Sequence, residues 1–334
     1  MMEPIRVFGP GTPVVQWERA ASQLLRAIRA HRSQVAFSRR LGYRSNPVAD
    51  WEAGRRFPTA AEMIRACEKA GIDIEAAFNR FDRATARHLG EGDDDGVAEW
   101  LSAWRGARTV HDVADRCDRS RYAVGRWLNG STRPRVPDFL RLVEALTGRA
   151  GDLIAELVSI EDVPALAPLR ARSEAIRRLQ QDVPWAGGLL MLLQSGPYRD
   201  LPAHRPGWLA RRLGIPIEEE SRSLQLLEAA SAVSWDGTRY RARDLVDLQH
   251  AHRDEEGLDH WHALAGSRME RPGTDDRFTG MVFLTDDEGY ARVQEAVRKA
   301  LQAVGTPVTA GTEIVGDRVG LLQVAVVDLT RAPL

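Results

Sequence analysis

Lysine is almost absent from this chain of 334 residues. Two of its 46 basic residues are lysines, Lys69 and Lys299, and the others are arginines. Because arginine is in excess over the whole length, its abundance fits the base composition of a GC-rich gene better than one particular function. The net charge of −1 excludes a uniformly basic protein, so a surface that binds nucleic acid has to be local.

Cysteine, long apolar runs and catalytic patterns are equally scarce. The two cysteines, Cys67 and Cys117, fall at apolar positions of helical patterns, which predicts small core residues in a reducing cytoplasm. No run of about 18 apolar residues and no leader is evident, so we expect neither a membrane span nor export. Without a phosphate loop, a nucleophile elbow or a recognisable Ser, His and Asp set, we expect no enzyme, no cofactor and no metal site.

The chain does contain an internal repeat without gaps. Aligning residues 21–70 with residues 97–146 gives eleven identities in fifty positions. Three of them lie close together and recur 76 residues later, with Trp51, Gly54 and Pro58 matched by Trp127, Gly130 and Pro134. A repeat of this length indicates one folding unit used twice.

Both copies show the periodicity of short helices. In the first copy, Ser33 caps a second helix, residues 45–53 form a third, and Thr59 caps a fourth. The second copy follows the same plan, with Thr109 and Ser120 as caps. Residues 16–75 hold 11 basic and 7 acidic residues, and residues 97–149 hold 10 and 6, so each copy has an excess of four positive charges. This local charge is typical of a nucleic-acid-binding unit.

The first copy resembles the repressor-type helix-turn-helix family related to phage repressors and Cro. The resemblance rests on a combined pattern: Gln34, the Leu41-Gly42 turn, Val48, the string of Trp51, Glu52 and Gly54, and Pro58. It implies a bundle of four or five helices whose third helix enters the major groove of double-stranded DNA. We therefore expect a sequence-specific transcriptional regulator, and a repressor in particular.

The first copy offers two kinds of DNA contact. Short polar or small residues at the exposed side of the third helix are candidates to contact base edges: Ser45, Asn46, Ala49 and Asp50. The family position at the start of helix two and the flanking arginines are candidates for phosphate: Gln34, Arg44, Arg55 and Arg56. A solvated surface is the alternative for the three arginines. Trp51 and Gly54 are expected to be structural.

The second copy departs from the family pattern. Val110 replaces the phosphate-binding glutamine, Asp118 replaces the turn glycine, and Leu128 stands where Glu52 does. Its exposed residues nevertheless suit DNA, with Arg121, Tyr122 and Arg126 for bases and Ser120, Arg133 and Arg135 for phosphates. DNA contact and a purely structural duplicate both remain open for this copy, in which Trp127 and Gly130 are expected to be structural.

Beyond residue 170 the pattern changes. A short helix (206–213), a turn at Gly214, a helix (217–230) and a hairpin with Asp236-Gly237 in a type I′ turn follow the winged-helix order. Three acids, Glu218–Glu220, favour a structural or dimerising role for this unit over DNA contact. The last part predicts an α+β module with strands at Met281–Leu284 and Val319–Leu329. Residues from about 170 onward resemble an uncharacterised family of bacterial regulators with these two modules.

The predicted fold is mainly α with a small α+β module at the end. Its parts are an arm (1–15), two helix-turn-helix domains (16–83 and 97–159), a winged-helix domain (170–245) and a sensing or dimerisation module (246–334). Residues 90–96 and 160–169 are predicted linkers.

The predicted partners follow from these parts. Double-stranded DNA is the expected ligand, and the protein is expected in the cytoplasm with the nucleoid. The apolar strand Val319–Leu329 needs more cover than its own module offers, which favours a homodimer through the C-terminal half. An effector or a protein partner is also possible. The alternative function is a protein-interaction adaptor, such as an antitoxin-like or defence-system component, whose helix-turn-helix units no longer bind DNA.

Overall fold

The computed structural model describes residues 15–106, 108–242, 258–309 and 318–326, so most of the predicted arm lies outside it. The chain divides into two compact units between Ser173 and Glu174. The described residues are mainly helical, and their sheet is one antiparallel pair of strands. Over these residues no helix has both the length and the apolar character that crossing a bilayer needs.

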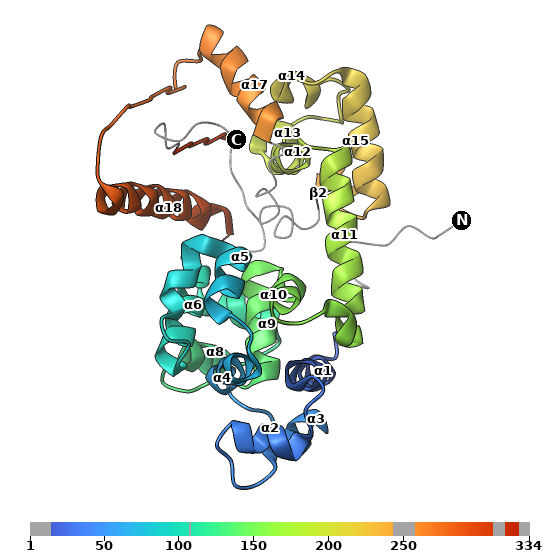
Figure 1. Ribbon diagram of the computed structural model, residues 1–334. Helices are drawn as coiled ribbons and strands as arrows, with labels where there is room; N and C mark the ends of the chain where they lie inside the picture. The colour runs from blue at the N-terminus through green and yellow to red at the C-terminus, as the bar shows by residue number, and fades with distance from the viewer. Residues whose placement is uncertain (1–14, 107, 243–257, 310–317, 327–334) are drawn as a thin grey trace. The chain divides into compact units, whose positions relative to one another are not determined.

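The described residues of the first unit form helices only (Figure 1). The helices are α1 (Trp17–Arg29), α2 (Gln34–Arg40), α3 (Pro47–Glu52), α4 (Ala60–Ala70), α5 (Ile74–Ala86), α6 (Asp94–Arg105), α7 (Val110–Cys117), α8 (Arg121–Leu128), α9 (Val136–Thr147), α10 (Ala150–Leu157) and the beginning of α11 (Ala167–Asp182). Short 3-10 helices lie between them: η1 (Arg87–Leu89), η2 (Ile160–Asp162) and η3 (Pro164–Leu166).

The repeat is visible in the helix boundaries. Helices α2 and α7, α4 and α9, and α5 and α10 each begin 76 residues apart, so the repeat includes a fifth helix beyond the aligned sequence. The predicted N-caps are confirmed. Ser33 and Ser120 accept a hydrogen bond from the first turn of their helices, and Thr59 and Thr109 each form a capping box. Local capping chemistry therefore sets the same helix starts twice.

The turn between the second and third helices survives the loss of its glycine. Gly42 has a φ of +87°, in the left-handed region that favours glycine. Asp118, the equivalent residue, adopts the same region with φ 51° and ψ 52°. Aspartate is one of the few other residues that tolerate this conformation, so the departure from the family pattern does not change the turn.

The third helices differ at their starts. Residues 45–53 were the predicted helix, but α3 begins at Pro47, because a proline disfavours helical geometry in the residue before it. Ser45 and Asn46 thus precede the helix. In the second repeat, Ala123 takes the place of the proline and α8 begins two positions earlier, at Arg121.

The two repeats share one hydrophobic core. Trp100 on α6 is fully buried, and its ring lies 5.1 Å from that of Phe78 in the first repeat and 6.0 Å from that of Phe139 in the second. The predicted linkers belong to this unit as well. Gly92 and Gly96 are buried at the first, and Val163, Leu166 and Leu169 are buried at the second. The two predicted helix-turn-helix domains thus lie in one compact unit with a common core.

The contacts between the repeats are reciprocal. The amide of Ala60 donates to the carbonyl of Pro134, and the amide of Val136 donates to that of Pro58, both at 3.0 Å. These four residues are two pairs of equivalents, and they enclose the bridge between Thr59 and Arg135. Helix α1 packs on α9 as α6 packs on α4, and α5 packs on its own equivalent α10. The repeats are therefore related by a local two-fold axis, as subunits of a homodimer are.

The first part of the second unit packs five helices and a hairpin around an apolar core. It contains the rest of α11 with α12 (Ala186–Gln194), α13 (Gly196–Arg199), α14 (Ala210–Leu213), α15 (Ile217–Ala229), β1 (Val233–Trp235) and β2 (Tyr240–Ala242). Glu220 on α15 is buried and accepts hydrogen bonds from the amides of Gly207 (3.0 Å) and Ala210 (2.5 Å). The carboxylate of Glu220 therefore fixes the segment before α14. Glu218 and Glu219, on the same first turn of α15, are not buried.

The predicted hairpin is present, with a different turn. Strands β1 and β2 pair from Val233 with Ala242 to Trp235 with Tyr240. A type I′ turn at Asp236-Gly237 needs a positive φ at both residues, but only Gly237 has one, at +96°. The side chain of Asp236 instead accepts hydrogen bonds from the amides of Thr238 and Arg239, both at 2.9 Å. The type I′ prediction is therefore wrong.

The predicted α+β module is not borne out over its described residues. They contain α17 (Leu258–Glu270) and α18 (Asp287–Thr309), and the side chain of Asp286 caps α18 by accepting a hydrogen bond from the amide of Gly289. Residues 281–284 and 318–326 form no strand, and their apolar side chains are largely exposed. A strand needs a paired backbone as well as an apolar pattern, and neither segment has one. Residues 327–329 of the second predicted strand lie outside the described part, and the dimer argued from that strand loses this support.

A shared core predicts that the repeats unfold together. Trp100→Ala should cost about 3–5 kcal/mol, because it empties a site that both repeats line. Trp127→Ala should cost less, because Trp127 is only partly buried. In hydrogen exchange of the full-length protein, Trp100→Ala should weaken the protection of α4 and α9 amides together. Protection lost from one repeat only would show two independent domains.

Candidate nucleic-acid interface

The surface that fits nucleic acid best is on α8. Val124 and Leu128 hold this helix against the core, and Arg121, Tyr122 and Arg126 face solvent. Tyr122 is 69% exposed, so its ring and its hydroxyl are both available to a ligand. The guanidinium of Arg121 lies 4.9 Å from the centre of its ring and donates to its hydroxyl at 3.0 Å. The contact orders both side chains at the start of the helix.

Arg126 completes this surface one turn further along α8. It is exposed, and no acidic side chain in the described part of the chain pairs with its guanidinium. Ser120 is engaged as the N-cap of the helix through its hydroxyl. The structure thus places three of the predicted DNA-contacting residues on one exposed face of a single short helix. That face can donate hydrogen bonds to base edges or phosphates.

The corresponding surface of the first repeat is less free. The Ser38 hydroxyl donates to Oδ1 of Asn46 at 2.8 Å, which leaves the Asn46 amide nitrogen available to a ligand. Arg55 donates to Oδ1 of Asp50 from Nε at 2.9 Å and from Nη2 at 2.6 Å. The arginine balances the charge of Asp50 and is itself partly occupied. Ser45 is exposed and Ala49 is half-buried.

A buried polar network joins α3 to α1 and α2. Glu52 is 6% exposed, and its carboxylate accepts from Nε of Arg29 at 2.5 Å and from Nε2 of Gln34 at 2.8 Å. Gln34 is therefore hydrogen-bonded to protein at the position predicted to contact phosphate. In the sequence, Gln34 and Glu52 stand out only as parts of a family pattern, and nothing there predicts their contact. Arg44 and Arg56 are exposed, as expected.

The second repeat has apolar residues at the positions of this polar network. Val110 and Leu128 occupy the positions of Gln34 and Glu52. Leu128 is buried in the hydrophobic core, and Val110 is partly buried and packs against it. Another contact is kept with different chemistry. Tyr43 donates to Glu62 at 3.3 Å, and their equivalents, Arg119 and Asp138, form an ion pair at 2.7 Å. The substitutions in the second copy are therefore coordinated and compatible with the same helix placement.

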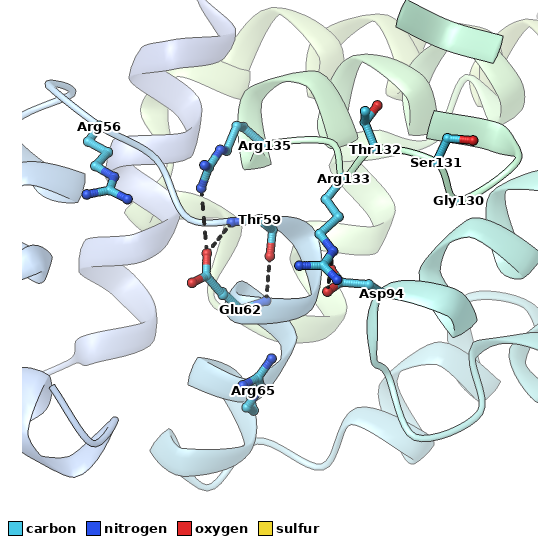
Figure 2. A pocket seen from close by; sticks show the side chains of 10 residues that line it. All are labelled: Arg56, Thr59, Glu62, Arg65, Asp94, Gly130, Ser131, Thr132, Arg133 and Arg135. Carbon is cyan, nitrogen blue, oxygen red and sulfur yellow. Dashed lines mark hydrogen bonds and ion pairs between the residues drawn. The ribbon is translucent and has the colours of Figure 1, made fainter. Parts of the chain in front are cut away.

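An arginine-lined cleft lies between the two repeats (Figure 2). Its volume is about 590 Å³, and its walls come from the turns after α3 and α8 and from the starts of α4, α6 and α9. The arginines in it are Arg56, Arg65, Arg133 and Arg135, and the acidic residues are Glu62 and Asp94. Arg65 was missed because an arginine on α4 carries no local signal that distinguishes it from other surface arginines.

The cleft has an excess of positive charge. Arg133 pairs with Asp94 at 2.8 Å, and Arg135 donates to the carbonyl of Phe57 at 3.0 Å with Glu62 3.7 Å away. Arg56 and Arg65 have no acidic partner within the described residues. The N-terminal ends of three helices add to the positive potential. The two arginines predicted to bind phosphate, Arg133 and Arg135, are thus partly engaged, and Arg56 and Arg65 are the freer cations.

Comparisons of this chain with protein-family models, with curated proteins and with solved structures found no match.

The buried network predicts an ordered set of stabilities. Glu52→Ala should destabilise the protein by about 3–5 kcal/mol, because it leaves Arg29 without its main partner in a desolvated site. Gln34→Val combined with Glu52→Leu copies the second repeat and should cost less, despite the additional change. Urea unfolding of the full-length variants measures both values. A double variant as unstable as Glu52→Ala would show that the two repeats do not share this packing.

Proposed function

We propose that this protein is a sequence-specific regulator of transcription that binds double-stranded DNA, most simply as a repressor in the bacterial nucleoid. In this proposal the α2–α3 and α7–α8 pairs are helix-turn-helix elements of the repressor type. Their third helices, α3 and α8, enter the major groove. The C-terminal unit then regulates or dimerises the protein.

The exposed face of α8 carries this proposal. Arg121 and Arg126 are suited to bidentate contacts with guanine, and Tyr122 offers a hydroxyl and an apolar ring edge. Nothing in the fold of the unit requires this combination at the surface, because Val124 and Leu128 already supply the packing of the helix. The four arginines of the cleft support phosphate contact beside α8.

The second unit supports a regulatory role in a different way. The order α14, turn, α15, β1 and β2 is that of a winged helix, and we assign it this role. The start of α15 carries Glu218 and Glu219, which phosphate would repel. We therefore place its function in packing or dimerisation rather than in DNA contact.

A protein-interaction adaptor is the second candidate function. It is favoured by the exposed apolar residues at 281–284, of which Met281, Val282 and Leu284 are each more than 80% exposed. Such residues are more typical of a protein-binding surface than of a free one. An adaptor of this kind would retain the helical repeats for packing alone.

Salt dependence separates the two functions. A DNA-binding protein should bind random duplex DNA with an affinity that falls steeply as salt rises, because bound cations are released from the phosphates. Arg56→Ala with Arg65→Ala should weaken binding to all sequences. It should also flatten the slope of log affinity against log salt by up to about two units.

Arg83→Ala is the matched control, because Arg83 is an exposed arginine on α5, away from the cleft and from α8. Fluorescence anisotropy with labelled duplexes gives the slopes. If the wild-type protein binds weakly and without salt dependence, and selection from random duplexes enriches no sequence, the regulator proposal is wrong and the adaptor is favoured.

A further inference from the structure

We propose that one chain of this protein covers a whole operator made of two unlike half-sites, one contacted by α3 and the other by α8. This inference rests on the proposed function, and it specifies the DNA partner further. It replaces the usual arrangement of such proteins, in which two identical subunits bind two identical half-sites.

The first support is the local two-fold axis between the repeats. Thr59 pairs with its own equivalent Arg135, and Arg80 pairs with its own equivalent Glu156 at 2.6 Å. Only residues next to the axis can contact their equivalents. The axis therefore passes close to both pairs, and it relates α3 to α8 within one compact unit.

The second support is the place of α3 and α8 along this axis. The turns that follow α3 and α8 line one cleft together with Thr59 and Arg135, so both helices lie towards that end. Helices α5 and α10, which carry Arg80 and Glu156, lie towards the other end (Figure 1). Two related helices at the same end of a two-fold axis can face one DNA duplex together.

The cleft fits this arrangement. It lies between the turns that follow α3 and α8, on the side of the Thr59–Arg135 pair, and both of these residues line it. Its positive charge then faces the stretch of duplex between the half-sites. Phosphates are the only strong anions there, so Arg56 and Arg65 contact the backbone at the centre of the operator.

The third support is that the repeats differ at all four positions predicted to contact bases in the first repeat. Ser45, Asn46, Ala49 and Asp50 of the first repeat correspond to Arg121, Tyr122, Gly125 and Arg126 of the second. An amide such as that of Asn46 suits adenine, whereas arginines suit guanine. Asp50 and Arg126 are opposite in charge. The same palindrome therefore cannot satisfy both helices, and the operator has to be asymmetric.

The experiment begins with selection of bound sequences from random duplexes by the full-length protein. Native mass spectrometry of the complex with the selected duplex then counts chains per operator. Arg126→Ala removes a candidate contact of α8. Asn46→Ser removes the amide of the first repeat, whose Oδ1 accepts from Ser38, and leaves a small polar side chain in its place. Arg83→Ala is the matched control in which DNA binding should not change.

We expect one chain per operator and a non-palindromic sequence. Each variant should lose about 5- to 150-fold in affinity for the selected site. Arg126→Ala should relax base preference at one end of the site only, and Asn46→Ser at the other end only. Circular dichroism of each variant checks that the fold is retained.

Two other results would overturn the inference, and they are distinguishable. A palindromic site with two chains on it, or variants that relax both ends equally, would reject the single-chain operator and leave DNA binding intact. Enrichment of no sequence at all would reject the inference together with the proposed function.

Discussion

The structure of the first unit depends on a core that neither repeat can complete alone. Trp100 extends from the second repeat into aromatic residues of the first, and α1 and α6 each pack on the fourth helix of the other repeat. A bundle of some seventy residues has little stability to spare, and mutual burial of apolar faces supplies it. The two repeats therefore form an internal dimer, in which each copy is a structural partner of the other.

This mutual burial explains how the copies diverged. The inner faces stayed similar because both contribute to one core, and the helix caps and turns stayed in register. The contacts that hold the third helix differ in a coordinated way. In the first repeat they are the hydrogen bonds to Glu52, and in the second they are the apolar side chains of Val110 and Leu128. The outer faces were free to differ in charge. In a homodimer, one sequence serves both halves, so this freedom does not exist.

Local signals in the sequence predicted much of this fold. Caps such as Ser33 and Thr59 act on the next turn of chain, and the turn glycines act through their own φ, so a short window contains the whole cause. That the two repeats share one core was not predictable in this way. An apolar pattern predicts that a helix face is buried, but it does not specify which surface covers that face. The strands expected at 281–284 and 318–326 failed for a related reason: a strand depends on a backbone partner that its own sequence does not specify.

In the candidate site, the exposure of Arg121, Tyr122 and Arg126 followed from periodicity. The pairing of Asp50 with Arg55 and the inward bond of Gln34 required the tertiary structure.

The local two-fold axis at which the repeats meet has a direct covalent test. Thr59 and Arg135 are opposite each other at a non-hydrogen-bonded position of an antiparallel bridge, where Cα atoms lie about 4.5 Å apart and a disulfide fits. Burial raises the pKa of Cys67 and raises that of Cys117 to about 12, so neither native thiol should compete. Under mild oxidation, the protein with Thr59→Cys and Arg135→Cys should form a disulfide within one chain, and neither single variant should. A double variant that stays reduced, or that links different chains, would contradict the account.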